Sequence, residues 1–421
     1  MIVEGSFENM KVALISSGLI RVPPTRGGAI EEYVFQLTQS LRKLGIDATA
    51  FDRAFSGDKT CLVGPLIRIR TPEMPRYLPR KDFPQELSFG LSSVRKLKKY
   101  DLIHANTGLA GFAIAKSTRN GPKLVYTCHN PEWTSERVHW GEKVIRKIES
   151  YNMRRSNAVI ALNDTMKRAL NEKAHVPLQR LFLIPNGVDT NFFRPALQSD
   201  IIDRKYGLEG KRVILYVGKV SHIKRAQVLL KSYKILLESY RYRNLKLLIV
   251  GPLSDQFTKQ SINWYARQVM RWACNNLPSD SYAFTGAVSK EELRMIYSRA
   301  YVLVLPSFAE AFGMVLLEAM ASACPVIGSA SGGIVDVISN GVNGYLFGTG
   351  DALDLASKID MLLSNESLRK SLGLNSRRIA TEVYDWRVIA KKLMALYERL
   401  LHCDQDEQEV EHNPNLQLPS S

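Results

Sequence analysis

The chain has 421 residues, of which 45% are hydrophobic and 9% aromatic, and this composition is typical of a soluble globular protein and excludes a mainly disordered or fibrous one. Its apolar runs are shorter than the ~20 residues needed to cross a bilayer, and its start lacks the basic and apolar regions of a signal peptide. The formal net charge of +16 indicates an anionic partner, and the five scattered cysteines argue against disulfides and a zinc site.

The first half of the chain alternates short apolar runs with helical patterns. An apolar run that begins at Lys11 predicts a buried strand, and the loop after it ends in Gly27-Gly28. An amphipathic helix is predicted from about Ala29 to Leu44. Further strands are predicted at residues 45–51, 100–104, 122–129, 157–162 and 180–185. Strands that alternate with helices indicate a parallel sheet covered by helices.

The same alternation restarts after the turn-rich segment Pro185–Pro195. Strands are predicted at residues 212–218, 245–250, 282–285, 301–305, 325–328 and 344–347. We therefore predict an α/β protein with two doubly wound parallel-sheet domains in tandem, residues 10–195 and 196–384. A further helix is predicted at residues 385–401, and residues 402–421 are expected to form a disordered acidic tail. Ligands of this fold class bind at the carboxyl ends of strands, so the chemistry is expected in a crevice between the domains.

Two glutamates, Glu310 and Glu318, flank an apolar segment that follows the predicted strand 301–305. The first falls in a strand-to-helix loop, and the second falls in the helix that follows. A carboxylate in so apolar a helix needs a partner, and the hydroxyls of a ribose fit that need. Gly313 permits close approach of the backbone to a ligand, and the N–H groups at the helix start suit anionic or hydroxylated groups. Two unrelated surface glutamates are the alternative.

Two other loops carry groups that suit phosphate. Gly27-Gly28 can present backbone N–H groups at a strand-to-helix turn, although a simple tight turn is the favoured explanation of the pair taken alone. Lys219 and Lys224 follow the first strand of the second half. At that position they can neutralise a diphosphate leaving group, and two solvated lysines are the alternative.

Two histidines, His104 and His129, end predicted strands of the first half. We expect His129 to project toward the crevice, but the spacing does not separate the two residues, and a structural role is the alternative for each. Two basic stretches of this half, residues 66–100 and 141–155, make binding to an anionic membrane surface plausible.

At these positions the chain resembles the retaining nucleotide-sugar glycosyltransferases of family 4, also termed glycosyl transferases group 1. The resemblance runs from about Lys11 to Leu401. Its motifs, in chain order, are Arg26-Gly-Gly-Ala-Ile-Glu31, Thr127-Cys-His129, Ile184-Pro-Asn-Gly-Val-Asp189, Tyr216-Val-Gly-Lys219 with Lys224, Phe284-Thr-Gly286, and Pro306-Ser-Phe-Ala-Glu310-Ala-Phe-Gly-Met-Val-Leu-Leu-Glu318-Ala. The family has the GT-B fold, two Rossmann-like domains with an interdomain cleft. The resemblance therefore implies an acceptor-side first domain, a nucleotide-sugar-binding second domain and a last helix that packs back on the first.

The resemblance also implies roles for the residues of the second half. Glu310 contacts hydroxyls of the donor sugar, and Glu318 holds the ribose. The amides of Phe312, Gly313 and Met314 position the sugar and the diphosphate.

Further implied roles belong to the glycines and cations. Gly27 and Gly28 bind phosphate from the first domain, and His129 meets the donor sugar. Lys219 and Lys224 offset the charge of the leaving group. The base is read by backbone groups around Gly286 and Val288.

Two positions depart from the family pattern. Lys219 stands where arginine is frequent, which keeps the charge but loses bidentate geometry. Arg225 stands where glycine is frequent.

The implied activity is transfer of a hexose or an N-acetylhexosamine, with retention of configuration, from a nucleotide-diphosphate sugar to a lipid-linked or polysaccharide acceptor. No cofactor and no metal are expected, and the implied location is cytoplasmic, with peripheral attachment to the membrane as an option. A nucleotide-sugar epimerase of the same fold is one alternative. A basic, non-catalytic nucleic-acid-binding protein is another, although the chain has no recognised motif for nucleic acid, and none is expected as a partner.

Overall fold

The computed structural model describes residues 10–24, 28–55, 65–72, 82–118, 121–134, 140–195, 200–239, 241–242, 244–254 and 262–412. These residues form two compact units. Unit 1 holds the described residues up to Leu162, those of Met166–Pro185 and those from Trp386 onward, whereas unit 2 holds Asn163–Thr165 and the described residues of Asn186–Asp385.

Unit 1 is built on a parallel sheet of seven strands in the order β3-β2-β1-β4-β5-β6-β7. The strands are β1 (Lys11–Ile15), β2 (Asp47–Arg53), β3 (Leu66–Ile69), β4 (Leu102–Ala105), β5 (Lys123–Thr127), β6 (Ala158–Ala161) and β7 (Leu181–Leu183). The order runs one way from β1 to β3 and the other way from β4 to β7. The winding therefore reverses between β1 and β4, which makes this the topological switch point of unit 1.

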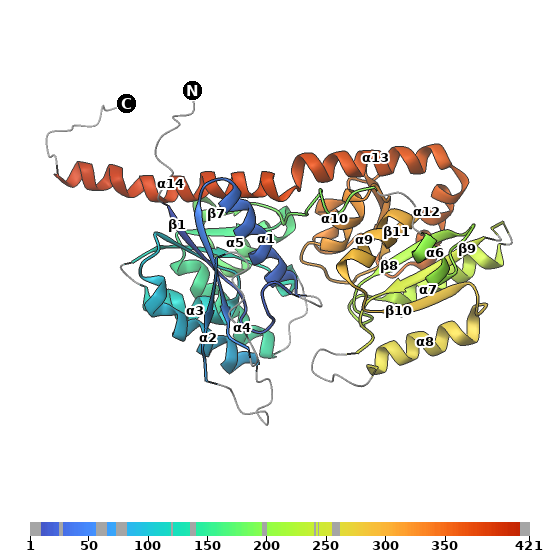
Figure 1. The fold of residues 1–421 in the computed structure, drawn as a ribbon, viewed down its shortest axis with the longest axis horizontal. Helices are drawn as coiled ribbons and strands as arrows, with labels where there is room; N and C mark the ends of the chain where they lie inside the picture. Colours follow the sequence, from blue (N-terminus) through green and yellow to red (C-terminus); the bar gives the residue numbers. More distant parts are fainter. Residues whose placement is uncertain are drawn as a thin grey trace. The chain divides into compact units, whose positions relative to one another are not determined.

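The helices of unit 1 are α1 (Ala29–Lys43), α2 (Asp82–Leu97), α3 (Gly108–Ser117), α4 (Trp140–Arg155), α5 (Asp164–Ala174), the short η1 (Pro131–Thr134) and η2 (Leu178–Arg180), and α14 (Trp386–His412). Figure 1 shows α14, in red, beside α1, in blue, and the two helices contact each other. Their apolar faces bury Leu37, Leu41, Ile389 and Leu393 against β1. The periodicity of these side chains explains why both segments are helical.

The last helix is longer than the sequence pattern predicted. It runs to His412, whereas the sequence predicted a helix to residue 401 and a disordered tail from residue 402. The glutamates and glutamines of this stretch favour a helix even though they are polar. Residues 413–421 lie outside the described part of the chain.

Unit 2 has a parallel sheet of six strands in the order β10-β9-β8-β11-β12-β13. The strands are β8 (Arg212–Val217), β9 (Leu245–Val250), β10 (Tyr282–Gly286), β11 (Val302–Leu305), β12 (Val326–Ser329) and β13 (Gly344–Phe347). Its helices are α6 (Asp200–Tyr206), α7 (Ala226–Glu238), α8 (Trp264–Asn276), α9 (Lys290–Arg299), α10 (Met314–Ala321), α11 (Ile334–Val337), α12 (Ala352–Ser364) and α13 (Glu366–Val383). The switch point of this sheet lies between β8 and β11.

The turn-rich segment after Pro185 is held by unit 2. The Val188 N–H donates to the carbonyl of Tyr384 at 2.7 Å, and the Thr190 hydroxyl donates to the Asp385 carboxylate. The Arg377 guanidinium donates to the carbonyls of Thr190 and Phe193, each at 2.9 Å. These contacts explain why residues 186–195 cluster with unit 2, whereas the sequence placed the domain boundary at residue 195.

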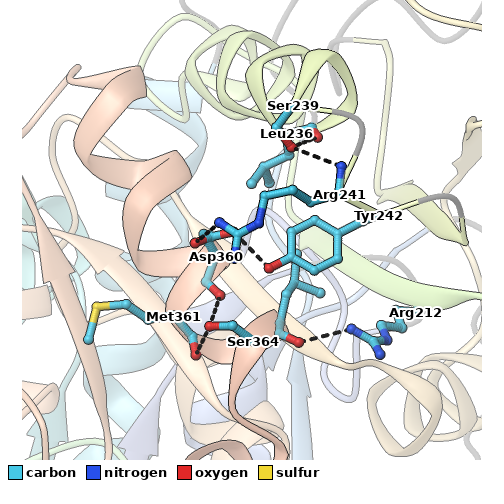
Figure 2. A network of polar contacts seen from close by, with 9 residues as sticks. Arg212, Leu236, Ser239, Arg241, Tyr242, Asp360, Met361 and Ser364 are labelled. Atoms are coloured by element: carbon cyan, nitrogen blue, oxygen red, sulfur yellow. Dashed lines mark hydrogen bonds and ion pairs between the residues drawn. The ribbon is translucent and has the colours of Figure 1, made fainter.

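A polar network joins helices and strands of unit 2 at the amino ends of the strands. Figure 2 shows Arg241 and Tyr242, which precede β9, directed at Asp360 of α12. Arg241 contacts both carboxylate oxygens at 3.0 and 2.9 Å, and the Tyr242 hydroxyl donates at 2.7 Å. Arg212, the first residue of β8, donates to the carbonyl of Leu363 at 2.9 Å. The network therefore fastens α12 to the sheet at the end opposite to the carboxyl ends of the strands.

Candidate functional site

The loops after β8 and β11 bring opposite charges together at the switch point of unit 2. The Lys224 ammonium forms an ion pair with the Glu310 carboxylate, and the two side chains are 28% and 15% exposed. The Phe308 N–H donates to the carbonyl of Ile223 at 2.8 Å, which ties the two loops by their backbones. The sequence analysis selected both charged residues, but it did not pair them.

The loop after β12 fixes the backbone around Glu310. Gly332 has a φ of 52°, and a Cβ there would lie 2.6 Å from the Glu310 carbonyl oxygen. The Gly333 N–H donates to the same oxygen at 2.8 Å. Asn163, which clusters with unit 2, donates its side-chain amide to the carbonyl of Ala311 at 2.6 Å. Sequence reasoning missed these three residues, although the pair Gly332-Gly333 after a strand was a visible signal.

Helix α10 starts at the glycine that the sequence singled out. Gly313 is its N-cap residue with a φ of 86°, a conformation that side chains disfavour, and Met314 is the first helical residue. Phe312 is buried and packs edge-on against Tyr384, with ring centroids 5.9 Å apart. The first N–H groups of a helix lack partners within the helix, and the helix dipole makes this end favourable for an anion.

Glu318 lies one turn into α10 and is half-buried rather than buried. The Tyr297 hydroxyl of α9 donates to its carboxylate at 2.7 Å. Burial raises the pKa of the Tyr297 hydroxyl, and the neighbouring Glu318 charge raises it further. The carboxylate therefore has a protein partner, as the apolar helix requires, and it keeps partial access to solvent.

The remaining sequence-selected residues of unit 2 lie in three loops. Lys219 is half-buried, and its carbonyl accepts from the Tyr216 hydroxyl at 3.0 Å. Arg225 is the N-cap of α7 with a φ of 48°, so it occupies a conformation in which glycine is the usual residue. Its guanidinium lies 4.5 Å from the centroid of the Phe308 ring. Gly286, with a φ of 71°, ends β10, and the half-buried Val288 lies just beyond it.

Unit 1 has a cavity of about 450 Å³ at its own switch point. Its wall includes Ser17 from the loop after β1, Asn106 and Thr107 from the loop after β4, and His129 from the loop after β5. The volume lies in the range of about 300–1,000 Å³ that is common for small-molecule sites. Parallel strands thus bring polar side chains that are distant in sequence to one opening.

The structure separates His104 from His129. His104 is fully buried in β4, and its Nδ1 and Nε2 contact the hydroxyls of Tyr397 and Thr127 at 2.6 and 2.5 Å. His129 lines the cavity, and its Nε2 lies 3.2 Å from Oδ1 of Asn106. Burial lowers the pKa of each imidazole to about 3, so both rings are neutral near pH 7. His104 is therefore a packing residue, and His129 faces a ligand-sized space.

Gly28 is the N-cap residue of α1 and has a backbone conformation that favours glycine. Its φ is 115°, and a Cβ there would lie 2.8 Å from Oε2 of Glu31. Glu31 is buried and accepts a hydrogen bond from the Ser17 hydroxyl. Burial raises the pKa of the Glu31 carboxyl, and the Ser17 hydrogen bond partly offsets this effect. Gly27 lies outside the described residues.

Two glutamates that sequence reasoning did not select also line the cavity. Glu149 of α4 is 4% exposed and accepts from Tyr126 at 3.1 Å, Asn130 at 3.0 Å and Trp133 at 2.6 Å. Glu86 of α2 accepts from the N–H groups of Leu109 and Ala110 at 2.9 and 3.2 Å. Burial raises the pKa of both carboxyls. Neither residue lies in a motif, so only the folded chain brings them to the site.

The described residues also bear on two other kinds of site. No group of three or more His, Cys, Asp or Glu side chains in the described ranges is arranged to hold a metal ion. Within the same ranges, no helix combines the length and the apolar character needed to span a membrane.

Two models of known protein families together match nearly all of the chain outside its two ends. The model described as Glycosyltransferase Family 4 matches residues 27–192, and the model described as Glycosyl transferases group 1 matches residues 198–379. A D-inositol 3-phosphate glycosyltransferase from Thermobispora bispora is 28% identical to this chain over 89% of it and 90% of the relative. A mannosylfructose-phosphate synthase from Agrobacterium fabrum is 26% identical over 92% of this chain and 91% of the relative.

Solved structures support the same grouping. A sucrose-phosphate synthase from Thermosynechococcus elongatus superposes with a TM-score of 0.78 at 25% identity, covering 94% of this chain and 100% of that one. The Anabaena protein HepE, solved with UDP and glucose, superposes with a TM-score of 0.75 at 22% identity over 93% of this chain and 100% of that one, and so shares the fold. The predicted architecture of two parallel-sheet α/β domains is confirmed. The matches favour neither the epimerase nor the nucleic-acid-binding alternative.

Proposed function

Because the chain belongs to the family 4, group 1 glycosyltransferases, we propose that it moves a hexose or an N-acetylhexosamine from a nucleotide-diphosphate sugar to a lipid-linked or polysaccharide acceptor, with retention of configuration. One observation carries this proposal. The ion pair between Lys224 and Glu310 lies at the switch point of unit 2, where doubly wound sheets bind nucleotides. The structures of HepE with UDP and glucose and with UDP-glucose support a nucleotide sugar as the donor.

In the donor site that we propose, different elements bind different parts of the nucleotide sugar. The loop after β11 offers the Glu310 carboxylate to hydroxyls of the sugar, and the start of α10 offers its N–H groups to the diphosphate. Glu318, oriented by Tyr297, accepts hydrogen bonds from the ribose. Gly286 and Val288 contribute backbone groups to base recognition.

Catalysis then rests on orientation and on stabilising the departing diphosphate. The ammonium groups of Lys219 and Lys224 and the dipole of α10 oppose the negative charge that develops on the leaving group. Preorganised donors of this kind are worth ~10²-fold or more in rate when one is removed. For His129 and Gly28 we keep the roles that the family resemblance implies, a contact with the transferred sugar and one with phosphate. We propose that the reaction needs no metal.

A thermal-shift panel with UDP, GDP, ADP and CMP tests the donor site. A ligand at about a hundred times its Kd adds about 2.7 kcal/mol, which moves Tm by several degrees. One nucleotide is expected to stabilise the wild type and the control Glu382→Ala, an exposed glutamate of α13, but not Glu318→Ala. If no nucleotide stabilises the wild type, the proposed donor site is wrong.

The stereochemistry and the metal requirement need separate measurements. The anomeric coupling of the product, read by proton NMR, should match that of the donor sugar. EDTA should leave the rate unchanged. An inverted product, or a rate that EDTA abolishes and Mg²⁺ restores, contradicts that part of the proposal. A donor sugar that is isomerised without an acceptor favours an epimerase instead.

We also propose peripheral attachment to an anionic membrane surface at the cytoplasmic face through α4. Lys143 and Lys147 of this helix are exposed beside Val144, which is 37% exposed. Cations and apolar groups together favour the interface of an anionic bilayer. Sedimentation with phosphatidylserine vesicles should deplete the wild type but not the double variant Lys143→Glu, Lys147→Glu. Equal sedimentation of the two proteins contradicts this attachment.

A further inference from the structure

The cavity of unit 1 has a chemical character that the sequence did not reveal. Among the described residues that line it, three are acidic, Asp82, Glu86 and Glu149, and none is lysine or arginine. His129 adds no positive charge, because burial keeps its imidazole neutral near pH 7. The described lining therefore offers hydrogen-bond acceptors and no lysine or arginine.

Glu86 is the carboxylate of this group best placed to meet a ligand. Both oxygens of Glu149 are occupied by Tyr126, Asn130 and Trp133. In contrast, the hydrogen bonds of Glu86 to the N–H groups at the start of α3 use one oxygen, Oε1. Glu86 is half-buried and lines the cavity. Burial raises the pKa of the Glu86 carboxyl, and Thr107 and the N–H groups at the start of α3 partly offset this effect.

Two other residues of the cavity wall, Thr107 and Asn106, bear on hydroxyl binding. Thr107 is 7% exposed and lines the cavity. Its hydroxyl forms no hydrogen bond of ordinary geometry with the described residues. The hydroxyl nevertheless lies close enough to Glu86 to lower the pKa of that carboxyl. A buried hydroxyl in this situation gains from a polar ligand. Asn106 donates its amide to the carbonyls of Ile15 and His104 at 3.1 and 3.3 Å, so its Oδ1 accepts from Nε2 of His129. This assignment leaves Nδ1 of His129 as an acceptor.

We propose that the part of the acceptor that enters this cavity is an uncharged, hydroxyl-rich group, a sugar ring or a polyol, and that Glu86 selects against phosphorylated acceptors. The inference rests on the proposed glycosyl transfer and defines its acceptor. A carboxylate and a neutral imidazole acceptor match hydroxyl donors, whereas a phosphate beside Glu86 meets an acidic group with no lysine or arginine among the described lining residues to offset it.

The test compares matched acceptors with the full-length enzyme. Rates are measured with the nucleotide sugar that the thermal-shift panel identifies, on methyl glucoside against glucose 6-phosphate and on myo-inositol against inositol phosphate. The wild type is expected to prefer the uncharged member of at least one pair by about a hundredfold in kcat/KM, which corresponds to two like charges held a few ångströms apart. Glu86→Gln keeps an oxygen for the N–H groups of Leu109 and Ala110 and removes the charge, so this preference should fall about tenfold or more.

A control variant separates selectivity from folding. Asp101→Asn removes an exposed carboxylate before β4, at the opposite end of that strand, and should leave the preference unchanged. If Glu86→Gln lowers kcat/KM equally for both acceptors of a pair, the ratio of the two values stays unchanged. The effect of the substitution is then purely structural, and the role of Glu86 in selectivity is overturned. Better transfer to the phosphorylated members, or transfer to no uncharged member, overturns the proposed acceptor class. Absence of nucleotide binding by the wild type is a separate outcome, and it contradicts the proposed function itself.

Discussion

The two histidines at the carboxyl ends of β4 and β5 differ in what their ring nitrogens contact. Both nitrogens of His104 face hydroxyls in the core, whereas His129 faces Asn106 and the cavity. Two acidic residues also differ in their partners. The Glu149 carboxylate accepts hydrogen bonds from three donors within unit 1, whereas the Glu310 carboxylate is paired with the Lys224 ammonium in unit 2. At this scale, function depends on which polar groups retain room for a ligand.

Replacing His104 should change how stability depends on pH. The folded pKa of about 3 lies below the ordinary 6.5, so the unfolded chain binds a proton first as pH falls, and stability is lost from pH 6.5 downward. One such group contributes a slope of about 1.4 kcal/mol per pH unit. Urea unfolding of His104→Asn between pH 4 and 6 should show a slope shallower than that of the wild type by about this amount. Equal slopes would mean that His104 is already charged in the folded protein.

Replacing Tyr297 should weaken nucleotide binding without removing the carboxylate. Tyr297→Phe deletes the hydroxyl that donates to Glu318, and a hydrogen bond to a charged group is worth about 1.5–3 kcal/mol. We therefore expect the Kd for the identified nucleotide to rise by roughly tenfold. Tyr233→Phe is the matched control, because its hydroxyl donates to the carbonyl of Ser281 at 2.8 Å in the same unit. An equal rise in both variants, measured by calorimetry, would refute the role of Tyr297 in orienting Glu318.

The loops that follow β11 and β12 together position Glu310. Each leaves the carboxyl end of a buried parallel strand, so their backbones meet where the strands stop. Glycine at residues 332 and 333 lets the two backbones approach closely at Glu310 and Ala311, and the Glu310 side chain pairs with Lys224. The position of the carboxylate is therefore a property of two elements together.

Gly332→Ala should disturb this arrangement. The new Cβ would lie 2.6 Å from the Glu310 carbonyl oxygen, so the backbone that carries Glu310 has to move. We expect a loss of about 2–3 kcal/mol in the free energy of unfolding and a fall in transfer rate of ~10²-fold. Gly341→Ala provides the control, since its φ of 79° carries the same strain but no atom lies within 4 Å of the added Cβ. Equal transfer rates in the two variants would show that the loop contact does not position Glu310.

The whole molecule consists of two units whose cores are separate, and the chain returns to unit 1 at Trp386 after completing unit 2. Helix α14 thereby supplies a face of the unit 1 core from the opposite end of the sequence. Its buried side chains include Ile389, Leu393 and Tyr397, each 0% exposed. Unit 1 thus depends on the last helix for its stability, whereas the nucleotide site that we propose lies in unit 2.

Leu393→Ala should therefore separate the stability of the two units. Removal of a fully buried leucine costs about 2–5 kcal/mol, and this loss should lower the unfolding temperature of unit 1. Leu374→Ala, at a position 69% exposed on α13, should change stability by less than about 0.5 kcal/mol. Calorimetry with the identified nucleotide should show that the ligand still stabilises unit 2 in both variants. Loss of that stabilisation in Leu393→Ala alone would mean that the units do not respond separately.

The sequence by itself determined the alternation of strands and helices, because each buried strand is a short apolar run and each helix shows its own periodicity. It also placed Glu310 in a loop and Glu318 in a helix. It missed β3, since Leu66–Ile69 is a short edge strand in which only Ile69 is buried, and its apolar signal is weak. These features depend on residues close together in the chain, and local pattern is enough to predict them.

Only the tertiary structure decided which of these residues meet. The order of the strands, and therefore both switch points, depends on pairing between segments distant in sequence. The ion pair of Lys224 with Glu310, the contact of Asn163 with Ala311 and the entry of Glu86 into the cavity wall depend on that order. The physical reason is that a side chain acquires its partners, its burial and its pKa from neighbours that the packed core brings to it, and no local pattern records those neighbours.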